Sequence, residues 1–213
     1  MTDPTPIVDR DAFEVATAGG ELTGVRVEGV DLSGLVRPGL KIRDCQLEHV
    51  CLAGADLRGS VWSEVTLTDC DLTEASLDGS AWTGVRIERA LFARADLSGA
   101  TLHGVAATQA HLRGADLRVG AWARVELRMT DLTDANASGV RVREARFVDV
   151  ILTRSAWRVA MLQAVRIEAD EMRFCEAQGI DLTGLTGEQV VLSRVLMREG
   201  RLDGAKLDGA GLG

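Results

Sequence analysis

The sequence predicts an all-β solenoid, in which short backbone units stack into a column around an apolar axis. Three observations predict this fold: an apolar residue returns at every fifth position, a small residue stands two positions before it, and glycine gathers two positions after it. A period of five fits neither the 3.6-residue period of an α-helix nor the two-residue period of a strand. Because such a short unit cannot bury its own apolar face, successive units must stack.

The central register contains every fifth residue from Leu22 to Leu212, which makes 39 positions. Only Arg37 and Gly187 among them are not apolar. The small register, two residues earlier, has Asp170 as its only charged member, so 49 of the 51 charged residues after position 19 fall in the other three registers. Two of every five side chains are therefore expected to point inward.

Glycine indicates how the chain passes from one unit to the next. Of the 23 glycines, 16 stand two residues after a central position. A residue at this place is expected to adopt a turn conformation that glycine tolerates at low cost. The chain thus turns a corner every five residues, and each stretch pairs with the coil below it at about 4.8 Å.

The four tryptophans are expected in the core. Trp62, Trp82 and Trp122 are separated by multiples of 20, and each tryptophan, Trp157 included, has a serine or glycine two residues earlier. Close-packed interiors need this compensation of a large side chain by a small neighbour. We therefore favour core packing over an exposed tryptophan stripe for binding.

The units resemble those of a known family. Ala55–Gly59 (ADLRG), Ala95–Gly99 (ADLSG) and Ala115–Val119 (ADLRV) are similar to the A-(D/N)-L-x-x consensus of the pentapeptide-repeat family, and the likeness runs from residue 20 to residue 212. The resemblance implies a right-handed quadrilateral parallel β-helix with four units in each coil. The 39 units would make roughly ten coils and a rod on the order of 45 Å long.

The chain is expected to have two regions. Residues 1–19 lack the repeat and are predicted to form an N-terminal cap segment, whereas residues 20–213 are predicted to form the β-helix. Two places break the pattern: Arg37-Pro38-Gly39, which predicts a bulge at residues 35–40, and Asp170 in the small register. At Asp170 a displaced backbone is favoured over a functional carboxylate, and both interpretations stay open.

The C-terminal coils are expected to form a homodimer. The sequence ends in phase with the repeat, so an uncovered last coil would offer apolar side chains and unpaired backbone groups to a second copy. Apolar residues that face outward nearby would widen this contact. The predicted interface contains Ile151, Phe174, Val191, Leu196, Leu207 and Leu212.

No catalytic residue, metal site or cofactor is expected. A rod filled by its own side chains offers no pocket, and no phosphate loop, nucleophile elbow or H-E-x-x-H motif is present. His49, His103 and His111 stand in three different registers, which disfavours a shared metal. The four cysteines form no C-x-x-C pair and no targeting or membrane segment is recognised, so we expect free thiols and a cytoplasmic protein.

The resemblance implies a DNA-mimicking partner of DNA gyrase. Members of the quinolone-resistance group are dimeric acidic rods that occupy the DNA groove of this type II topoisomerase, and modulate it or protect it from inhibitors. The net charge is -8, whereas about 45 Å of B-DNA carries roughly 26 negative charges, so the mimicry would be partial. The predicted acidic face contains Asp31, Asp56, Asp71, Glu74, Asp78, Asp96 and Asp116.

Three alternatives accompany this prediction. Asp56, Asp96 and Asp116 share one column and could instead hydrogen-bond the turn backbone, as aspartate commonly does. The rod could also be a general protein-interaction scaffold whose partner is unrelated to topoisomerases. Direct DNA binding is the least favoured, because residues 113–166 carry 10 basic side chains but interleave them with 6 acidic ones.

Overall fold

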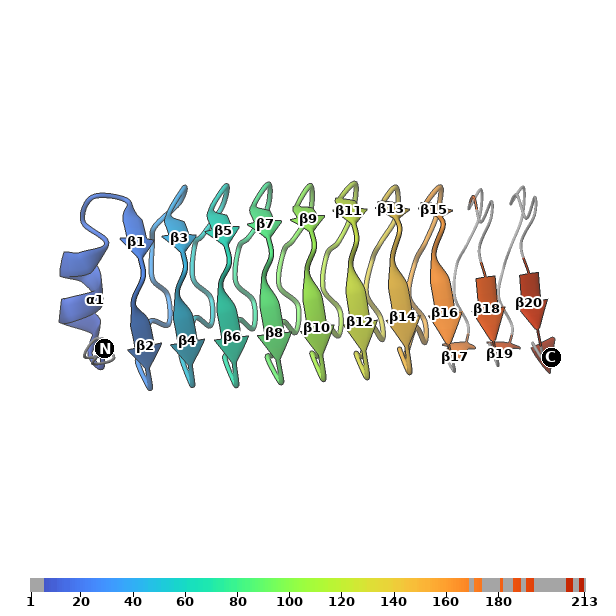
Figure 1. Cartoon of the computed structure of the whole chain (residues 1–213), viewed down its shortest axis with the longest axis horizontal. Helices are drawn as coiled ribbons and strands as arrows, with labels where there is room; N and C mark the ends of the chain where they lie inside the picture. Colours follow the sequence, from blue (N-terminus) through green and yellow to red (C-terminus); the bar gives the residue numbers. More distant parts are fainter. Residues whose placement is uncertain are drawn as a thin grey trace.

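The molecule is a rod of stacked coils with a short helix at its N-terminal end (Figure 1). The computed structural model describes residues 6–168, 171–173, 181, 186–188, 191–193, 206–208 and 211–212. All strand pairs are parallel and join residues that lie 20 apart, as in the pairing of Leu22 with Ile42. The predicted all-β parallel solenoid is therefore confirmed.

Three-residue strands form two long sheets, which we call the first and second strand sides. The first strand side contains β1 (Glu21–Thr23), β3 (Lys41–Arg43), β5 (Val61–Ser63), β7 (Ala81–Thr83), β9 (Thr101–His103), β11 (Ala121–Ala123), β13 (Arg141–Arg143) and β15 (Met161–Gln163). The second contains β2 (Arg26–Glu28), β4 (Gln46–Glu48), β6 (Thr66–Thr68), β8 (Arg86–Glu88), β10 (Ala106–Thr108), β12 (Glu126–Arg128), β14 (Arg146–Val148), β16 (Arg166–Glu168), β18 (Thr186–Glu188) and β20 (Lys206–Asp208).

Isolated bridges hold the other two sides of the coil, which we call the bridge sides. The first bridge side is the column that starts at Asp31, and the second is the column that starts at Val36. The first column continues into a three-stranded sheet of β17 (Glu171–Arg173), β19 (Val191–Ser193) and β21 (Gly211–Leu212). The four columns share the 20-residue step, so the coil has four sides. The first strand side contains eight strands and the second contains ten, whereas roughly ten coils were expected.

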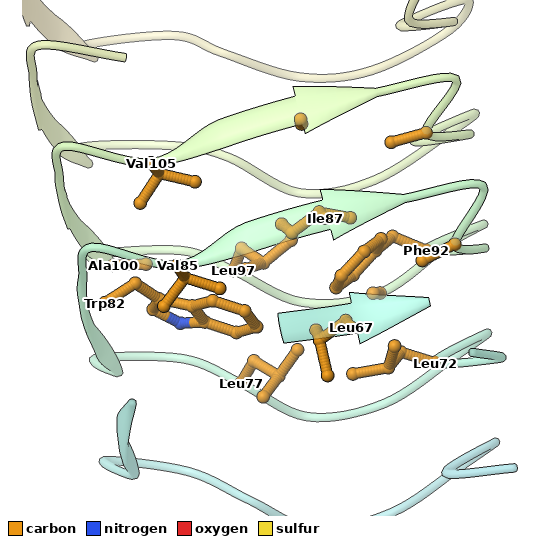
Figure 2. Close-up of a cluster of buried hydrophobic side chains, with 14 of the residues drawn as sticks. Leu67, Leu72, Leu77, Trp82, Val85, Ile87, Phe92, Leu97, Ala100 and Val105 are labelled. Carbon is orange, nitrogen blue, oxygen red and sulfur yellow. The ribbon is translucent and has the colours of Figure 1, made fainter. Parts of the chain in front are cut away.

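The core is a column of inward side chains, to which every side of the coil contributes (Figure 2). Leu67, Leu72, Leu77 and Trp82 come from four successive units and are all buried. Full burial of a leucine side chain contributes about 1.5–3 kcal/mol, so each coil adds several such increments. From Leu22 to Val165 the rod is thus stabilised in every coil and not by one central cluster.

All four tryptophans are buried. Trp62 and Trp82 stack with their ring centroids 4.8 Å apart. The small residue two positions earlier does more than leave room, because Ser80 Oγ accepts a hydrogen bond from Trp82 Nε1 at 2.7 Å and so satisfies a buried donor. The same arrangement recurs in Ser60–Trp62 and Ser155–Trp157.

The corners account for the glycines. In every unit from residue 24 to residue 164, the residue two after the centre has a positive φ, and 17 of these residues are not glycine. On the bridge sides the backbone also closes a hydrogen bond across the corner, as from Ala75 N to Leu72 O at 3.1 Å. A turn with a positive φ only at its third residue belongs to type II, which favours glycine there.

The segment before the repeat lies against the first coil. The helix α1 (Arg10–Ala16) is preceded by Asp9, whose side chain caps its N-terminus by accepting a hydrogen bond from Ala12 N. Phe13 is buried and belongs to the core cluster, and Ile7 forms a parallel bridge with Val27 of β2. The segment thus covers apolar side chains and part of an otherwise unpaired strand edge.

The predicted bulge at residues 35–40 is wrong. The coil is regular there, and Gly39 N donates to Arg58 O of the next coil at 2.8 Å. Pro38 takes the second position of a type II turn, where its fixed φ is favoured. Its missing N–H removes no bond between coils, because this position makes none on the bridge sides.

Arg37 avoids the cost of a buried charge because it belongs to the first coil. Its guanidinium donates to Val36 O at 3.0 Å and lies 3.9 Å from Glu14 of α1, so the charge leaves the axis. The prediction failed because it treated this coil as an interior one. Asp170, the other irregularity, lies outside the described residues.

Candidate functional site

The seven predicted acidic residues lie on the two bridge sides. The first bridge side carries Asp31, Asp71 and Glu74, and the second carries Asp56, Asp78, Asp96 and Asp116. The two bridge sides follow each other in the coil, so the wrap gathers these residues onto adjoining surfaces. None of the seven lies on a strand side.

Five of the seven carboxylates are tied into turns. Asp96 Oδ1 accepts a hydrogen bond from the backbone N–H of Ser98, two residues later, at 2.9 Å. The same bond is made by Asp31, Asp71, Asp116 and, at 3.4 Å, Asp56. In Asp31 the bond from the Ser33 backbone lowers the pKa of the carboxyl. Turn bonding, one of the alternatives above, is therefore observed, and it fixes these carboxylates in place.

Two of these aspartates are also neutralised by the arginine two residues later. Arg58 donates to both carboxylate oxygens of Asp56, at 2.8 and 2.7 Å, and these hydrogen bonds lower the pKa of Asp56. Burial would raise the pKa of Asp116, but the hydrogen bonds from Arg118, such as Nε to Oδ1 at 2.9 Å, outweigh it and the pKa is lowered. Both aspartates therefore stay ionised while their charge is locally balanced.

The uncompensated charge on the acidic face is small. Glu74 is paired with Arg94 of the next coil at 2.9 Å, whereas Asp71, Asp78 and Asp96 have no ion pair among the described residues. The five coils from residue 21 to residue 120 contain 14 acidic and 10 basic residues, a net charge of -4. This is less than one negative charge per coil, against roughly three on the same length of B-DNA. Any mimicry is confined to the unpaired carboxylates.

The structure also gathers three arginines of the basic stretch at residues 113–166 into one cluster, which we call the basic cluster. Arg141 and Arg143 of β13 lie on the first strand side with Arg124, which follows β11 and contacts His103 of β9. Within the described part of the chain, none of the three arginines has a carboxylate partner. Writing the sequence in rows of 20 would have revealed the cluster, because the wrap places these residues on neighbouring strands.

The predicted dimer residues are only partly within the described chain. Ile151 is 41% exposed on the first bridge side. The backbones of Val191, Leu207 and Leu212 lie in β19, β20 and β21. The remaining two predicted residues, Phe174 and Leu196, lie outside the described residues.

The histidines and cysteines form no site in the described part of the chain. The histidines lie on three different sides, as His49, His103 and His111, and no group of three metal-binding side chains occurs there. The described free thiols are Cys45, Cys51 and Cys70. Burial raises the pKa of the Cys70 thiol to about 11, which keeps it protonated and unreactive. No described helix is long and apolar enough to cross a membrane.

Comparison with known families identifies the repeat. The family model described as pentapeptide repeats matches residues 42–81 and 83–118, in eight copies. These residues therefore consist of pentapeptide repeats. The crystal structure of HetL, a pentapeptide-repeat protein involved in the regulation of heterocyst differentiation in the cyanobacterium Nostoc, is 19% identical. The match covers 92% of this chain and 96% of HetL with a TM-score of 0.63, which supports the shared fold.

Two further solved structures are similar to this chain. A pentapeptide-repeat protein of the Arabidopsis thaliana thylakoid lumen is 26% identical over 46% of this chain and 66% of its own, with a TM-score of 0.42. The plasmid-mediated fluoroquinolone-resistance protein QnrB1 is 17% identical over 91% of this chain and 82% of its own, with a TM-score of 0.35. The comparison with curated proteins gives no match.

Proposed function

We propose that this pentapeptide-repeat protein is a non-enzymatic binding rod that acts as a partial DNA mimic toward DNA gyrase or another type II topoisomerase. It would modulate the enzyme or protect it from inhibitors. The proposal is carried by the placement of Asp71, Asp78 and Asp96, which lie on adjoining bridge sides without an ion-pair partner among the described residues. These carboxylates lie on two successive coils, about 4.8 Å apart, and so present negative charge along part of the rod, as phosphates do along a duplex.

The turn bonds favour this role because they hold the carboxylates rigidly. Asp71 Oδ1 accepts from Thr73 N and Asp96 Oδ1 from Ser98 N, each at 2.9 Å. A side chain that is already fixed loses little conformational entropy when a partner binds. A limited set of preorganised charges can thus contribute to recognition although the total charge is far below that of DNA.

The test is a gyrase supercoiling assay, run with and without a gyrase poison. We expect the wild type to inhibit supercoiling or to protect against the poison, and the double variant Asp78→Asn/Asp96→Asn to lose most of this effect. Asparagine at position 96 should keep the turn bond, because Asn136 makes it in the same column with Ser138 N at 3.2 Å. The variant therefore removes charge without loosening the fold.

Asp131→Asn is the matched control. Asp131 makes the same turn bond, with Thr133 N at 2.8 Å, and lies on the first bridge side outside the predicted acidic face. It should behave as the wild type. A wild type without effect at concentrations of tens of micromolar would remove the proposal, and equal activity of the double variant would show that these carboxylates are not involved.

A protein-interaction scaffold with another partner is the second candidate function, and the basic cluster favours it. Arg124, Arg141 and Arg143 offer guanidinium groups that have no carboxylate partner among the described residues. They lie beside the small side chains of Ala121 and Ala123, and such a surface suits an acidic protein. Affinity capture from native lysate would support this function if a partner other than gyrase binds the wild type and not Arg141→Ala/Arg143→Ala. Direct DNA binding would instead appear as a salt-sensitive gel shift.

The proposal includes a homodimer through the C-terminal coils and a location in the cytoplasm. Ile151, Val159 and Met161 support the dimer, because all three are apolar and exposed in neighbouring units. We expect Ile151→Asp to convert a dimer into a monomer in sedimentation experiments at micromolar concentration. Leu91→Asp is the matched control, since Leu91 lies in the same column with 40% exposure. A monomeric wild type would overturn the dimer.

A further inference from the structure

The interior of the rod contains a cavity around Ala107. The central residues of the second strand side are Leu67, Ile87, Ala107, Leu127 and Phe147 in successive coils, so the smallest stands between two large neighbours. The ladders on both sides of β10 hold the coils at a constant spacing, which prevents them from closing over the missing side chain. A cavity of about 40 Å³ remains.

The wall of the cavity is apolar. Trp82, Phe92 and Leu97 are among the residues that line it, and Figure 2 shows them directed toward the axis of the rod. Every lining residue carries an apolar side chain. Leu102 and Leu112 also line the cavity, and they are the only apolar central residues from 22 to 162 that are half-buried and not buried. Because both side chains are central and point inward, their uncovered surface faces the cavity.

Size and lining together define what the cavity can hold. A cavity needs about 10–15 Å³ for one water-sized probe, so about 40 Å³ has room for two or three. A buried water also needs two to four polar partners, whereas an apolar cavity stays dry and takes up apolar ligands. We propose that this cavity binds a small apolar ligand, either a molecule of two or three heavy atoms, such as dioxygen, or a single large atom, such as xenon.

The proposal is tested by NMR of methyl-labelled protein under xenon. We expect the methyl signals of Ala107, Leu102 and Leu112 to shift saturably over several bar of xenon, while those of Leu52 and Leu57, in a closely packed part of the core, stay in place. Ala107→Leu adds three carbon atoms where the cavity lies and should abolish the shifts. Ala107→Val should weaken xenon binding at least about tenfold.

Ala123→Leu is the matched control, because it adds the same atoms to the outer face of the neighbouring coil and leaves the cavity open. It should bind xenon as the wild type does. If Ala107→Leu fails to fold, as judged by its thermal transition, the valine variant carries the test. Absence of saturable shifts in the wild type overturns the proposal, and so does unchanged xenon binding in the folded Ala107 variants. A water resonance at the Ala107 methyl would show a hydrated cavity and would also overturn it.

Discussion

The strand sides and the bridge sides share one sequence period and differ in backbone. On the strand sides three consecutive residues pair with the next coil, whereas on the bridge sides, in the units from Asp31 to Ala156, a single bridge is followed by a type II turn closed by its own hydrogen bond. Both present a centre and a small residue to the axis, so burial does not choose between them. The choice must come from residues that face outward.

The residue before the centre carries a signal that distinguishes bridge sides from strand sides. Seven of the 14 such positions on the bridge sides, from Asp31 to Ala156, are Asp or Asn, and none of the 16 on the strand sides, from Glu21 to Arg166, is. Asp and Asn bond the backbone N–H two residues later and so favour a turn over a strand. The comparison teaches that the aspartates at this position of the repeat stabilise the turn.

Proline substitution should give the largest difference in stability between the strand sides and the bridge sides. Thr83→Pro places proline one residue after the centre in β7, where it removes a ladder donor and should cost about 3 kcal/mol, as within a helix. Ala93→Pro makes the same change in the bridge-side turn that Ala95 N closes onto Phe92 O, and should change stability by less than about 1 kcal/mol. Urea unfolding of both variants gives the two free energies. Equal losses would show that the two sides do not differ as described.

The corner between a bridge side and a strand side depends on a buried hydroxyl. Ser80→Ala leaves the buried indole N–H of Trp82 without its acceptor, which should cost about 1–3 kcal/mol in free energy of unfolding. In a Trp82→Phe background the same substitution should cost less than half as much, because the donor is gone. A double-mutant cycle without coupling would contradict the role of this bond.

Removal of a turn bond should have a smaller effect. Asp96→Ala should destabilise the protein by about 1 kcal/mol, whereas Asp96→Asn keeps the acceptor and should cost less than about 0.5 kcal/mol. Thr101→Ala, at the corresponding position of a strand side, should also cost less than about 0.5 kcal/mol. Thermal unfolding compares the three variants. A loss at Thr101 equal to that at Asp96 would remove the distinction between the sides.

The smallest expected effect is a gain. Val119 is 62% exposed and has a φ of 52°, a conformation in which a β-branched residue is strained. Val119→Gly relieves this strain but increases the entropy of the unfolded chain, so the net stabilisation should be about 0.5–1 kcal/mol. Met129→Gly makes the same exchange on a strand side, without β-branching, and should give less. Destabilisation of both would show that the corner conformation is not the limiting factor.

Much of the fold could be predicted because side-chain direction follows from charge alone. Placing Leu67 or Trp82 inside needs only the observation that charged residues avoid two registers of five. The difference between strand and bridge sides was not predicted, although the aspartates carry its signal. The bulge at Pro38 was wrong because the period contains no information on how a terminal coil releases Arg37 toward α1.

For the candidate site, the sequence predicted which aspartates share a column but not which of them remain without an ion pair. The 20-residue step places Asp56, Asp96 and Asp116 in one row, as the structure has them. Whether an aspartate remains unpaired depends on side-chain conformation, which brings Arg58 onto Asp56 and leaves Asp78 without a partner in the described chain. The sequence analysis identified the basic stretch at residues 113–166, but the clustering of Arg124, Arg141 and Arg143 depends on the wrap, which places them on neighbouring strands.

The constant spacing between coils means that the length of the rod increases in equal steps, one for each coil. Duplication of any 20 residues within the repeats would lengthen it by about 4.8 Å and leave every other column in register. Duplication of only five residues would move every later unit to the next side of the coil. Bridge-side units beyond the duplication, with their aspartates, would then stack on strand-side units. Insertions or deletions of 20 residues, or of a multiple of 20, should therefore be tolerated. Those of five residues should change which outward side chains are neighbours while leaving the interior apolar.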